Sequence, residues 1–334
     1  MQKIINLSLE QKEQIKKFKY NYAIYSVIKP TIEVIHQILE NKSIGSEQYS
    51  MLLTGDAGAG KTALATYIRD KYNDESNPYK ILFTRVPSKL SVQHLIREML
   101  SQLESLQSKL ILKKESDKAL TERLIAYIKE LDVQLIIINE FQELLEFKSI
   151  AEQQAIANTL KLISEEAQVP FLFVGMPWSE KITDDSQWSS RLAYKAELPY
   201  FKLSDDDSMS VYLEFLHELS KTLPFDIELD LTEEIYAFPL FSISKGETRI
   251  IKRLITEAII CMCHAGENTL NIEHFKQAYR RFDNSSKKNL FELPIDDIPI
   301  SEIDCYARYE KNDDGNFDKF DRKFLDSLPL SQIL

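Results

Sequence analysis

A glycine-rich segment that ends in lysine and threonine is the part of this sequence with the clearest chemical capability. The segment GDAGAGKT follows an apolar run, leads directly into a helical pattern and matches the G-x-x-x-x-G-K-[ST] spacing of a phosphate-binding loop. In such a loop, successive backbone N–H groups and the positive end of the next helix face phosphate oxygens. The expected phosphate-binding residues are Gly55, Asp56, Ala57, Gly58, Ala59, Gly60, Lys61, Thr62 and Ala63.

Two side chains of this loop have distinct expected roles. Lys61 would place its charge between the β- and γ-phosphates of a nucleoside triphosphate, and the Thr62 hydroxyl would bind Mg²⁺. The chain has only eight glycines and three of them fall in this segment, so a chance match is a poor explanation. No NKxD guanine-recognition pattern occurs, which disfavours GTP as the nucleotide.

A second polar pair ends the apolar run at 135–138. Asn139 and Glu140 stand where a nucleotide hydrolase of this type has two acids, the first for the water shell of Mg²⁺ and the second as general base. Glu140 keeps the base role, with a surface acid at a strand end as the alternative. Asn139 can reach the metal through water but brings no charge, so we expect weaker Mg²⁺ binding and weaker hydrolysis.

These residues require a parallel sheet to position them. Near-continuous apolar runs predict strands buried on both faces, which is typical of an α/β fold. The expected strands are 51–55, 80–86, 133–139, 169–175 and, more weakly, 194–198. Helical patterns lie between them at 62–71, 91–106, 120–130 and 151–166.

The remaining sequence divides into helical and irregular parts. The expected organisation is an N-terminal helical segment (1–48), an α/β nucleotide-binding domain (49–203), a helical lid domain (204–282) and an acidic tail (283–334). The tail mixes prolines and charges with isolated apolar residues, so it should be poorly ordered alone. Its apolar patches could fold against a partner or back onto the lid. Helical patterns outside the α/β domain are 9–18, 31–39, 208–220, 247–264 and 272–282.

Composition and charge limit the class of protein. The 334 residues are 44% hydrophobic and 28% charged, which excludes a disordered polymer. No run of about 18 apolar residues or signal peptide occurs, and three cysteines form no CxxC pair, so we expect a cytoplasmic protein with no membrane partner. The net charge of −11 is concentrated in 201–240 and 283–334, which leaves a basic face possible elsewhere.

Three further blocks resemble one family. The segments IIINEFQELLE (136–146), NTLKLISEEAQVPFLFVGMP (158–177) and DSQWSSR (185–191) are similar to the TniB/TnsC family of AAA+ ATPases, which regulate transposition in Tn7-like transposons, some of them CRISPR-associated. The resemblance covers roughly residues 30–282. It implies an AAA+ P-loop NTPase with a five-stranded parallel sheet and a C-terminal helical lid, which binds ATP and Mg²⁺ and acts as an ATPase.

The resemblance also assigns roles in the site. It implies that Arg191 reaches the γ-phosphate of a neighbouring subunit, with a surface Arg in a salt bridge as the alternative. Arg249 in GETR would approach the γ-phosphate of its own subunit, unless it lies on a solvated helix face. Met176 replaces a polar sensor residue of relatives, and with Asn139 it indicates slow hydrolysis. Trp178 could lie at a subunit interface or in the core, as could Trp188.

The resemblance implies binding to the backbone of double-stranded DNA. Phosphate contact requires positive charge at a suitable spacing and no sequence preference, although lysines between helices are often simply solvated. The candidate DNA-binding residues are Lys89, Lys109, Lys113, Lys114, Lys118 and Lys148.

The leading functional hypothesis is an ATP-switched oligomer on target DNA. The resemblance implies a hexameric or heptameric ring or a filament that is placed by a TniQ-like target-selection protein and recruits transposase subunits. One alternative is a replication-initiator or helicase-loader ATPase, which predicts an added winged-helix domain. Another is a nucleotide-binding scaffold that hardly hydrolyses ATP.

Overall fold

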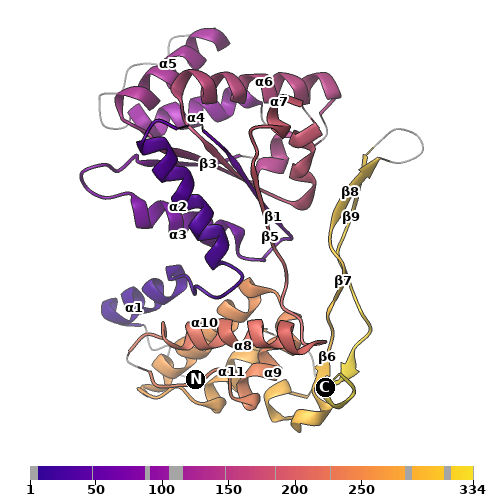
Figure 1. Ribbon diagram of the computed structural model, residues 1–334. Coiled ribbons are helices and arrows are strands. Elements are labelled where there is room, and N and C mark those ends of the chain that lie inside the picture. Colours follow the sequence, from indigo (N-terminus) through magenta and orange to yellow (C-terminus); the bar gives the residue numbers. More distant parts are fainter. Residues whose placement is uncertain are drawn as a thin grey trace.

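The structure is a computed structural model with two stacked domains and an extended C-terminal segment (Figure 1). The α/β domain occupies the upper part of the view, the lid helices lie below it, and the C-terminal segment runs beside both. The structure describes residues 7–46, 48–86, 91–104, 116–146, 148–184, 186–225, 227–282, 288–311 and 317–333.

A five-stranded parallel sheet forms the centre of the α/β domain, which confirms the expected fold class. The strand order is β2-β3-β4-β1-β5, and every neighbouring pair is parallel. Because the strands are parallel, their carboxyl ends lie along the same side of the sheet. At these ends Arg85 of β2 is in register with Asn139 of β3, and Asn139 is in register with Val174 of β4. The strands are β1 (Met51–Gly55), β2 (Ile81–Arg85), β3 (Leu135–Asn139), β4 (Phe171–Val174) and β5 (Tyr194–Leu198).

Helices cover both faces of this sheet. All of β3 is buried, and its side chains alternate between two cores, with Ile137 in the core shared with the lid and Ile136 and Ile138 in the core under the helices that precede and follow β3. This two-sided burial explains the continuous apolar run. The helices of the domain are α3 (Lys61–Tyr72), α4 (Val92–Glu104), α5 (Asp117–Glu130), α6 (Ile150–Ala167) and the short α7 (Ser186–Ser189), with 3-10 turns η1 (Phe141–Leu144) and η2 (Pro177–Asp184).

The N-terminal segment forms two helices, α1 (Leu9–Tyr20) and α2 (Lys29–Ser43). Ser8 and Gln11 form a capping box at the start of α1, which satisfies backbone N–H groups that would otherwise lack partners. Pro30 stands in the first turn of α2, where its missing N–H costs nothing. Helix α1 contacts the lid helix α10, so the N-terminal segment links the two domains.

The lid contains four helices: α8 (Asp206–Ser220), α9 (Glu234–Ser244), α10 (Thr248–Ala265) and α11 (Ile272–Phe282). Sequence patterns predicted three of these and missed α9. That helix is apolar nearly all round and carries Pro239 in its interior, so neither amphipathic periodicity nor propensity reveals it. Burial of Leu240 and Phe241 in the lid core stabilises the helix instead.

The described part of the tail folds as a long, interrupted hairpin after two 3-10 turns, η3 (Leu290–Glu292) and η4 (Ile295–Asp297). We refer to residues 299–311 and 317–329 as the C-terminal strap. Its outer pair is β6 with β11, followed by β7 with β10 and then β8 with β9, all antiparallel. The strands are β6 (Pro299–Ile300), β7 (Ile303–Cys305), β8 (Arg308–Lys311), β9 (Phe317–Phe320), β10 (Lys323–Phe324) and β11 (Leu328–Pro329), and η5 (Leu330–Gln332) follows.

The strap is ordered by the rest of the molecule. The buried Glu302 carboxylate accepts hydrogen bonds from the backbone N–H groups of Leu203 and Ser204, where the chain enters the lid, and the Ser242 hydroxyl donates to Pro299 O. Short two-stranded pieces are marginal alone, which agrees with the poor order expected for an isolated tail. In the described residues the tail folds back onto its own chain.

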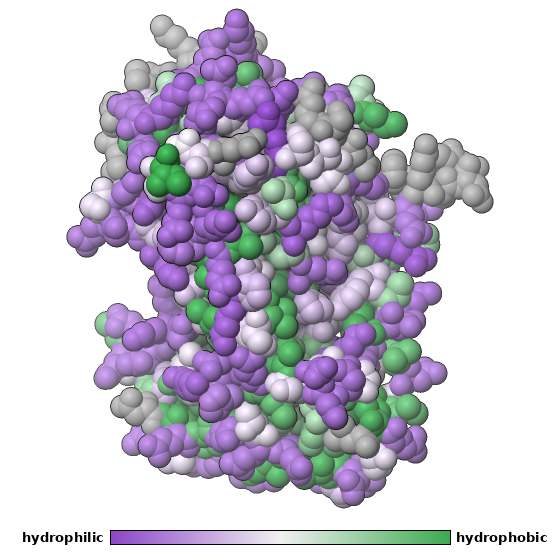
Figure 2. Space-filling model, in the orientation of Figure 1, coloured by the Kyte–Doolittle hydropathy of each residue, from purple (hydrophilic) through white to green (hydrophobic). Residues whose placement is uncertain are grey.

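The molecular surface is mostly hydrophilic in the view of Figure 2, and the hydrophobic side chains that it shows gather where the two domains meet and over the lid. Among the described residues, no helix has the length and apolar character needed to cross a bilayer.

Candidate nucleotide-binding site

The phosphate loop connects the end of β1 to the start of α3 and touches the lid. Gly58 and Gly60 have φ of 86° and 98°, values in the left-handed region that favours glycine. A Cβ atom at Gly58 would lie 2.1 Å from Glu247 Oε1, so glycine is also required by the close approach of the lid. The motif therefore holds a strained loop conformation and leaves room for a carboxylate from the second domain.

Lys61 lies in the first turn of α3 and is 8% exposed. Its ammonium group donates to Gly55 O and Asp56 O, each at 2.8 Å. Burial lowers its pKa to about 8, against the opposing effect of the Glu140 and Asp56 carboxylates. A buried cation held by backbone carbonyls alone is well suited to pair with a phosphate.

The two expected Mg²⁺ residues lie side by side. The Thr62 hydroxyl donates to Asn139 Oδ1 at 3.1 Å, across the space between α3 and the end of β3. Both oxygens are neutral and hard, so the pair fits a Mg²⁺ ion that retains most of its water shell and binds phosphate oxygens. Within the described ranges, no group of three or more His, Cys, Asp or Glu side chains could hold a metal ion.

Glu140 follows Asn139 and has a left-handed backbone conformation, with φ of 60° and ψ of 42°. Its Oε2 accepts a hydrogen bond from Gln142 Nε2 at 2.8 Å, and Arg85 at the end of β2 lies 4.0 Å from its Oε1. The strained backbone and these two contacts direct the carboxylate along the carboxyl edge of the sheet.

Gln142 is a residue of this site that the sequence reasoning did not select. Its Oε1 accepts a hydrogen bond from the Met176 N–H at 3.1 Å, so one buried amide links Glu140 to the end of β4. The Met176 position is thus linked to Glu140 through Gln142, by its backbone N–H and not by its side chain. A polar residue two positions after the strand-end pair is the sequence signal that could have revealed Gln142.

The lid places Arg249 beside the phosphate loop. Its backbone N–H donates to Gly58 O at 3.1 Å, and its guanidinium pairs with Glu247 Oε1 at 2.8 Å. The Arg249 side chain is 64% exposed, whereas that of Glu247 is only 2% exposed. Glu247 is the second residue that sequence reasoning missed, although it lies within the GETR segment.

Arg191 lies at the end of the sheet where the strands begin, whereas the phosphate loop follows the carboxyl end of β1. It precedes the start of β5, and its backbone oxygen accepts a hydrogen bond from Ser50, just before β1. Its guanidinium forms an ion pair with Glu165 of α6. Arg191 therefore cannot reach the phosphate loop of its own chain in this conformation.

The two tryptophans differ in their surroundings. Trp188 is fully buried and donates to Ala157 O, so it belongs to the core. Trp178 is half-buried, donates to Glu146 Oε1 at 2.7 Å and packs against Tyr309 of the strap.

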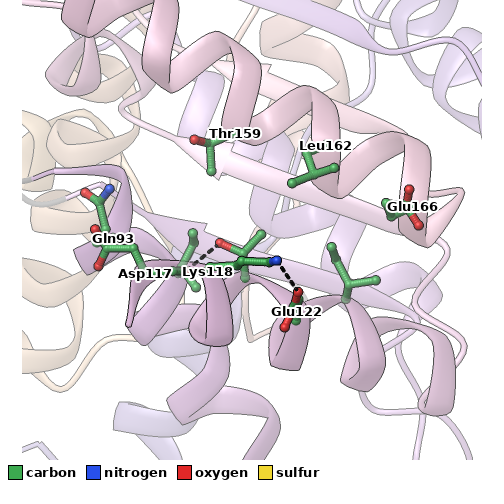
Figure 3. Close-up of a pocket in the computed structure, with 10 residues that line it drawn as sticks. Gln93, Asp117, Lys118, Glu122, Thr159, Leu162 and Glu166 are labelled. Atoms are coloured by element: carbon green, nitrogen blue, oxygen red, sulfur yellow. Dashed lines mark hydrogen bonds and ion pairs between the residues drawn. The ribbon is translucent and has the colours of Figure 1, made fainter. Parts of the chain in front are cut away.

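The predicted DNA-binding lysines are only partly covered by the structure. Lys89, Lys109, Lys113 and Lys114 lie outside the described residues. Lys118 is exposed on α5, forms an ion pair with Glu122 at 3.7 Å and lines a cavity between α4, α5 and α6 (Figure 3). Lys148 lies partly exposed before α6. The cavity of Figure 3 contains no residue of the phosphate loop.

Comparisons with known proteins agree with this geometry. Residues 44–183 match a family model described as an AAA domain. The ORC2 protein of Aeropyrum pernix in its ADP form is 16% identical, with a TM-score of 0.59 over 79% of this chain and 71% of that chain. The CDC6P protein of Pyrobaculum aerophilum is 13% identical, with a TM-score of 0.58 over 84% and 74%. No curated protein matches the chain.

The chain therefore has the AAA+ P-loop fold, with a helical region after the sheet. A third similar structure is the ORC1 protein of Aeropyrum pernix in complex with DNA, at 16% identity and a TM-score of 0.54, over 78% of this chain and 66% of that chain. Identities this low define the fold and leave the activity to be argued from the site.

Proposed function

We propose that this chain is an ATP-dependent, DNA-binding AAA+ regulator of DNA transposition that assembles into an oligomer. The observation that carries the nucleotide part is the convergence of Lys61, the Thr62–Asn139 pair and Glu140 at one sheet edge, with Arg249 delivered from the lid. Transposition is supported by the resemblance of the segments at 136–146, 158–177 and 185–191 to the TniB/TnsC family.

In the proposed mechanism, backbone N–H groups of the phosphate loop and Lys61 hold the β- and γ-phosphates. The Thr62 hydroxyl would hold Mg²⁺ and Asn139 would hold it through water, and the bound ion would neutralise charge on the phosphates. Glu140 orients and deprotonates the attacking water, and Gln142 fixes the direction of its carboxylate. The neutral Asn139 makes turnover slow, which suits a long-lived ATP-bound assembly.

Arg191 supports an oligomer because of its place in the fold. It lies at the sheet edge opposite the phosphate loop, so it can reach a γ-phosphate only in a neighbouring subunit. A guanidinium supplied across the contact makes ATP part of the interface. In the free chain the Glu165 carboxylate holds this guanidinium, and we infer that it is transferred from Glu165 to the phosphate when subunits associate.

A second candidate is a replication-initiator or helicase-loader ATPase. The similarity to ORC2 and CDC6P at the level of the fold favours it. That function predicts a winged-helix domain after the lid, whereas the described residues 288–311 and 317–333 form 3-10 turns and short strands. We prefer the transposition proposal because of the resemblance of segments 136–146, 158–177 and 185–191.

Fluorescence anisotropy of a labelled DNA duplex tests nucleotide-dependent DNA binding. We expect binding with ATP or a slowly hydrolysed analogue, weak binding with ADP, little dependence on DNA sequence and a steep loss with added salt. Lys61→Ala should bind DNA weakly with either nucleotide. Equal DNA binding in ATP, ADP and no nucleotide would contradict the proposal.

Transposition itself requires a cellular assay. The chain would be expressed with the transposase and target-selection protein of its own element, and insertions into a target plasmid would be counted. We expect insertion to need both this chain and Lys61. Insertion at normal frequency without the chain would refute the transposition role and leave the second candidate.

A further inference from the structure

The C-terminal strap contacts the phosphate loop where its hairpin is interrupted. A short gap on each side separates the β7–β10 pair from the β8–β9 pair. In this gap the Ala307 N–H donates to Asp56 Oδ2 at 2.9 Å, and the Arg322 guanidinium donates to Ala57 O at 2.9 Å. The interruption of the hairpin thus turns two donors toward the loop.

Arg322 is fixed by more than one partner. Besides Ala57 O, its guanidinium donates to the Tyr200 hydroxyl, which itself donates to Ala57 O. Its second terminal nitrogen donates to Glu247 Oε2 at 2.8 Å. The side chain is 28% exposed, so a strap residue becomes an integral part of the nucleotide site.

The Glu247 carboxylate is shared between two arginines. Its Oε1 pairs with Arg249 at 2.8 Å, and its Oε2 pairs with Arg322 at 2.8 Å. The carboxylate is 2% exposed and lies against Gly58 of the phosphate loop. A buried carboxylate must keep a cationic partner, because removal of one partner leaves an uncompensated charge in a poorly solvated place.

This arrangement affects how easily Arg249 can move. In the role that the resemblance implies, Arg249 contacts the γ-phosphate of ATP, and its guanidinium must then leave Glu247. With Arg322 in place, Glu247 remains paired after that movement. Without Arg322, the movement would leave Glu247 unpaired, and Arg249 would be retained by the carboxylate.

We propose that Arg322 is a positioning residue that favours ATP over ADP by keeping Glu247 paired while Arg249 turns to the γ-phosphate. This inference rests on the proposed function, because it needs nucleotide binding at the phosphate loop. Arg322 itself contacts the loop from the strap through Ala57 O and does not contact the phosphates. ADP lacks the γ-phosphate, so its affinity should not depend on the release of Arg249.

Nucleotide titrations of the full chain test this proposal. Affinities for ADP and for a slowly hydrolysed ATP analogue would be measured by calorimetry for wild type, Arg322→Ala and the matched control Lys323→Ala, an exposed neighbour on the strap. We expect Arg322→Ala to bind the ATP analogue about tenfold more weakly and to bind ADP as wild type does. Lys323→Ala should leave both affinities unchanged.

A charge-removal variant separates positioning from simple loss of structure. In the double variant Glu247→Gln with Arg322→Ala no carboxylate is left to retain Arg249, so the preference for ATP should be restored. Thermal unfolding tests whether each variant is folded. If Arg322→Ala is unfolded, Arg322→Lys takes its place: it keeps the charge and should retain part of the preference for ATP over ADP.

The possible outcomes are distinguishable. The positioning role would be overturned if Arg322→Ala lowers the affinities for the ATP analogue and ADP equally, changes neither affinity, or raises the affinity for the ATP analogue. Nucleotide binding at the loop would still stand. Failure of wild type to bind either nucleotide would refute the proposed function and this inference together.

Discussion

Two buried carboxylates receive a cation from the same strap, and they differ in what their other partner can do. Glu146, just after the 3-10 turn η1, pairs with Lys319 and accepts a hydrogen bond from the half-buried Trp178. Glu247, in the lid, pairs with Arg322 and with the exposed Arg249. We call these groups the body anchor and the lid anchor.

The difference separates attachment from switching. The partners of Glu146 lie close together, because Trp178 packs against Tyr309 and the half-exposed Lys319 lies over the Trp178 ring. At the lid anchor Arg322 is held by Ala57 O and the Tyr200 hydroxyl as well as by Glu247, whereas the Arg249 side chain is 64% exposed. We infer that the body anchor holds the strap in place, whereas the exposed Arg249 allows the lid anchor to link the strap to a bound phosphate.

The largest expected effect concerns Glu140, which belongs to neither anchor. Glu140→Gln should reduce ATP hydrolysis by about 10²–10⁴-fold and leave ATP binding nearly unchanged, because it removes the base and keeps the Gln142 contact region. Release of phosphate from radiolabelled ATP in single turnovers measures this. Unchanged hydrolysis would place the base elsewhere and remove the reason for the lid anchor to sense a γ-phosphate.

Lys61→Ala should weaken ATP binding by about 100-fold, since it removes a charge-assisted contact with phosphate in a buried place. Lys71→Ala, an exposed lysine on the same helix, should bind ATP as wild type does. Calorimetric titration measures both. Comparable affinity in the two variants would show that the phosphates do not bind at this loop.

The phosphate loop could be predicted from sequence because its residues are consecutive, whereas the residues of the two anchors are not. Glycine conformation, the lysine and the threonine act within eight consecutive residues, and four of the five expected strands were visible as apolar runs, with 194–198 weaker. Thr62 and Asn139, both expected near Mg²⁺, lie within hydrogen-bond distance in the structure. Local sequence therefore specifies the fold and much of the inner part of the site.

The anchors depend on contacts between distant segments. Arg322 and Glu247 are 75 residues apart, and the tail that carries Arg322 has the composition of a poorly ordered segment. Gln142 was less hidden, because its place two positions after the strand-end pair is a sequence signal, although a buried amide has no periodic signature. Arg322 and Glu247 act through a pairing that only the folded chain creates, so neither spacing nor composition could reveal it.

The pH dependence of ATP affinity gives a smaller effect. Burial lowers the pKa of Lys61 to about 8 in the free protein, and a bound phosphate should raise it again by stabilising the charged form. Lys61 is protonated below that pKa, so affinity should fall only above it, by about fivefold from pH 8 to pH 9 as binding takes up a proton. Titrations in buffers of different ionisation enthalpy measure the uptake. If the ATP affinity of Lys61→Ala has the same pH dependence as that of wild type, the titrating group is not Lys61.

The smallest expected effect concerns Lys319 of the body anchor. Lys319→Ala should lower the free energy of unfolding by about 1 kcal/mol, because Lys319 is half exposed and Glu146 keeps its bond from Trp178. The preference for ATP over ADP should be the same as in wild type. Thermal unfolding and nucleotide titration measure the two quantities. A change of nucleotide preference as large as that of Arg322→Ala would show that both anchors act in the same way.

Electron microscopy of negatively stained protein is the most direct test of the central claim that ATP is shared between subunits on DNA. Wild type, Lys61→Ala and Arg191→Ala would be imaged with a slowly hydrolysed ATP analogue, with and without duplex DNA. We predict rings or filaments that need nucleotide, increase with DNA and are lost in both variants. Particles of a single chain in every condition, or identical assemblies in wild type and Arg191→Ala, would contradict the account.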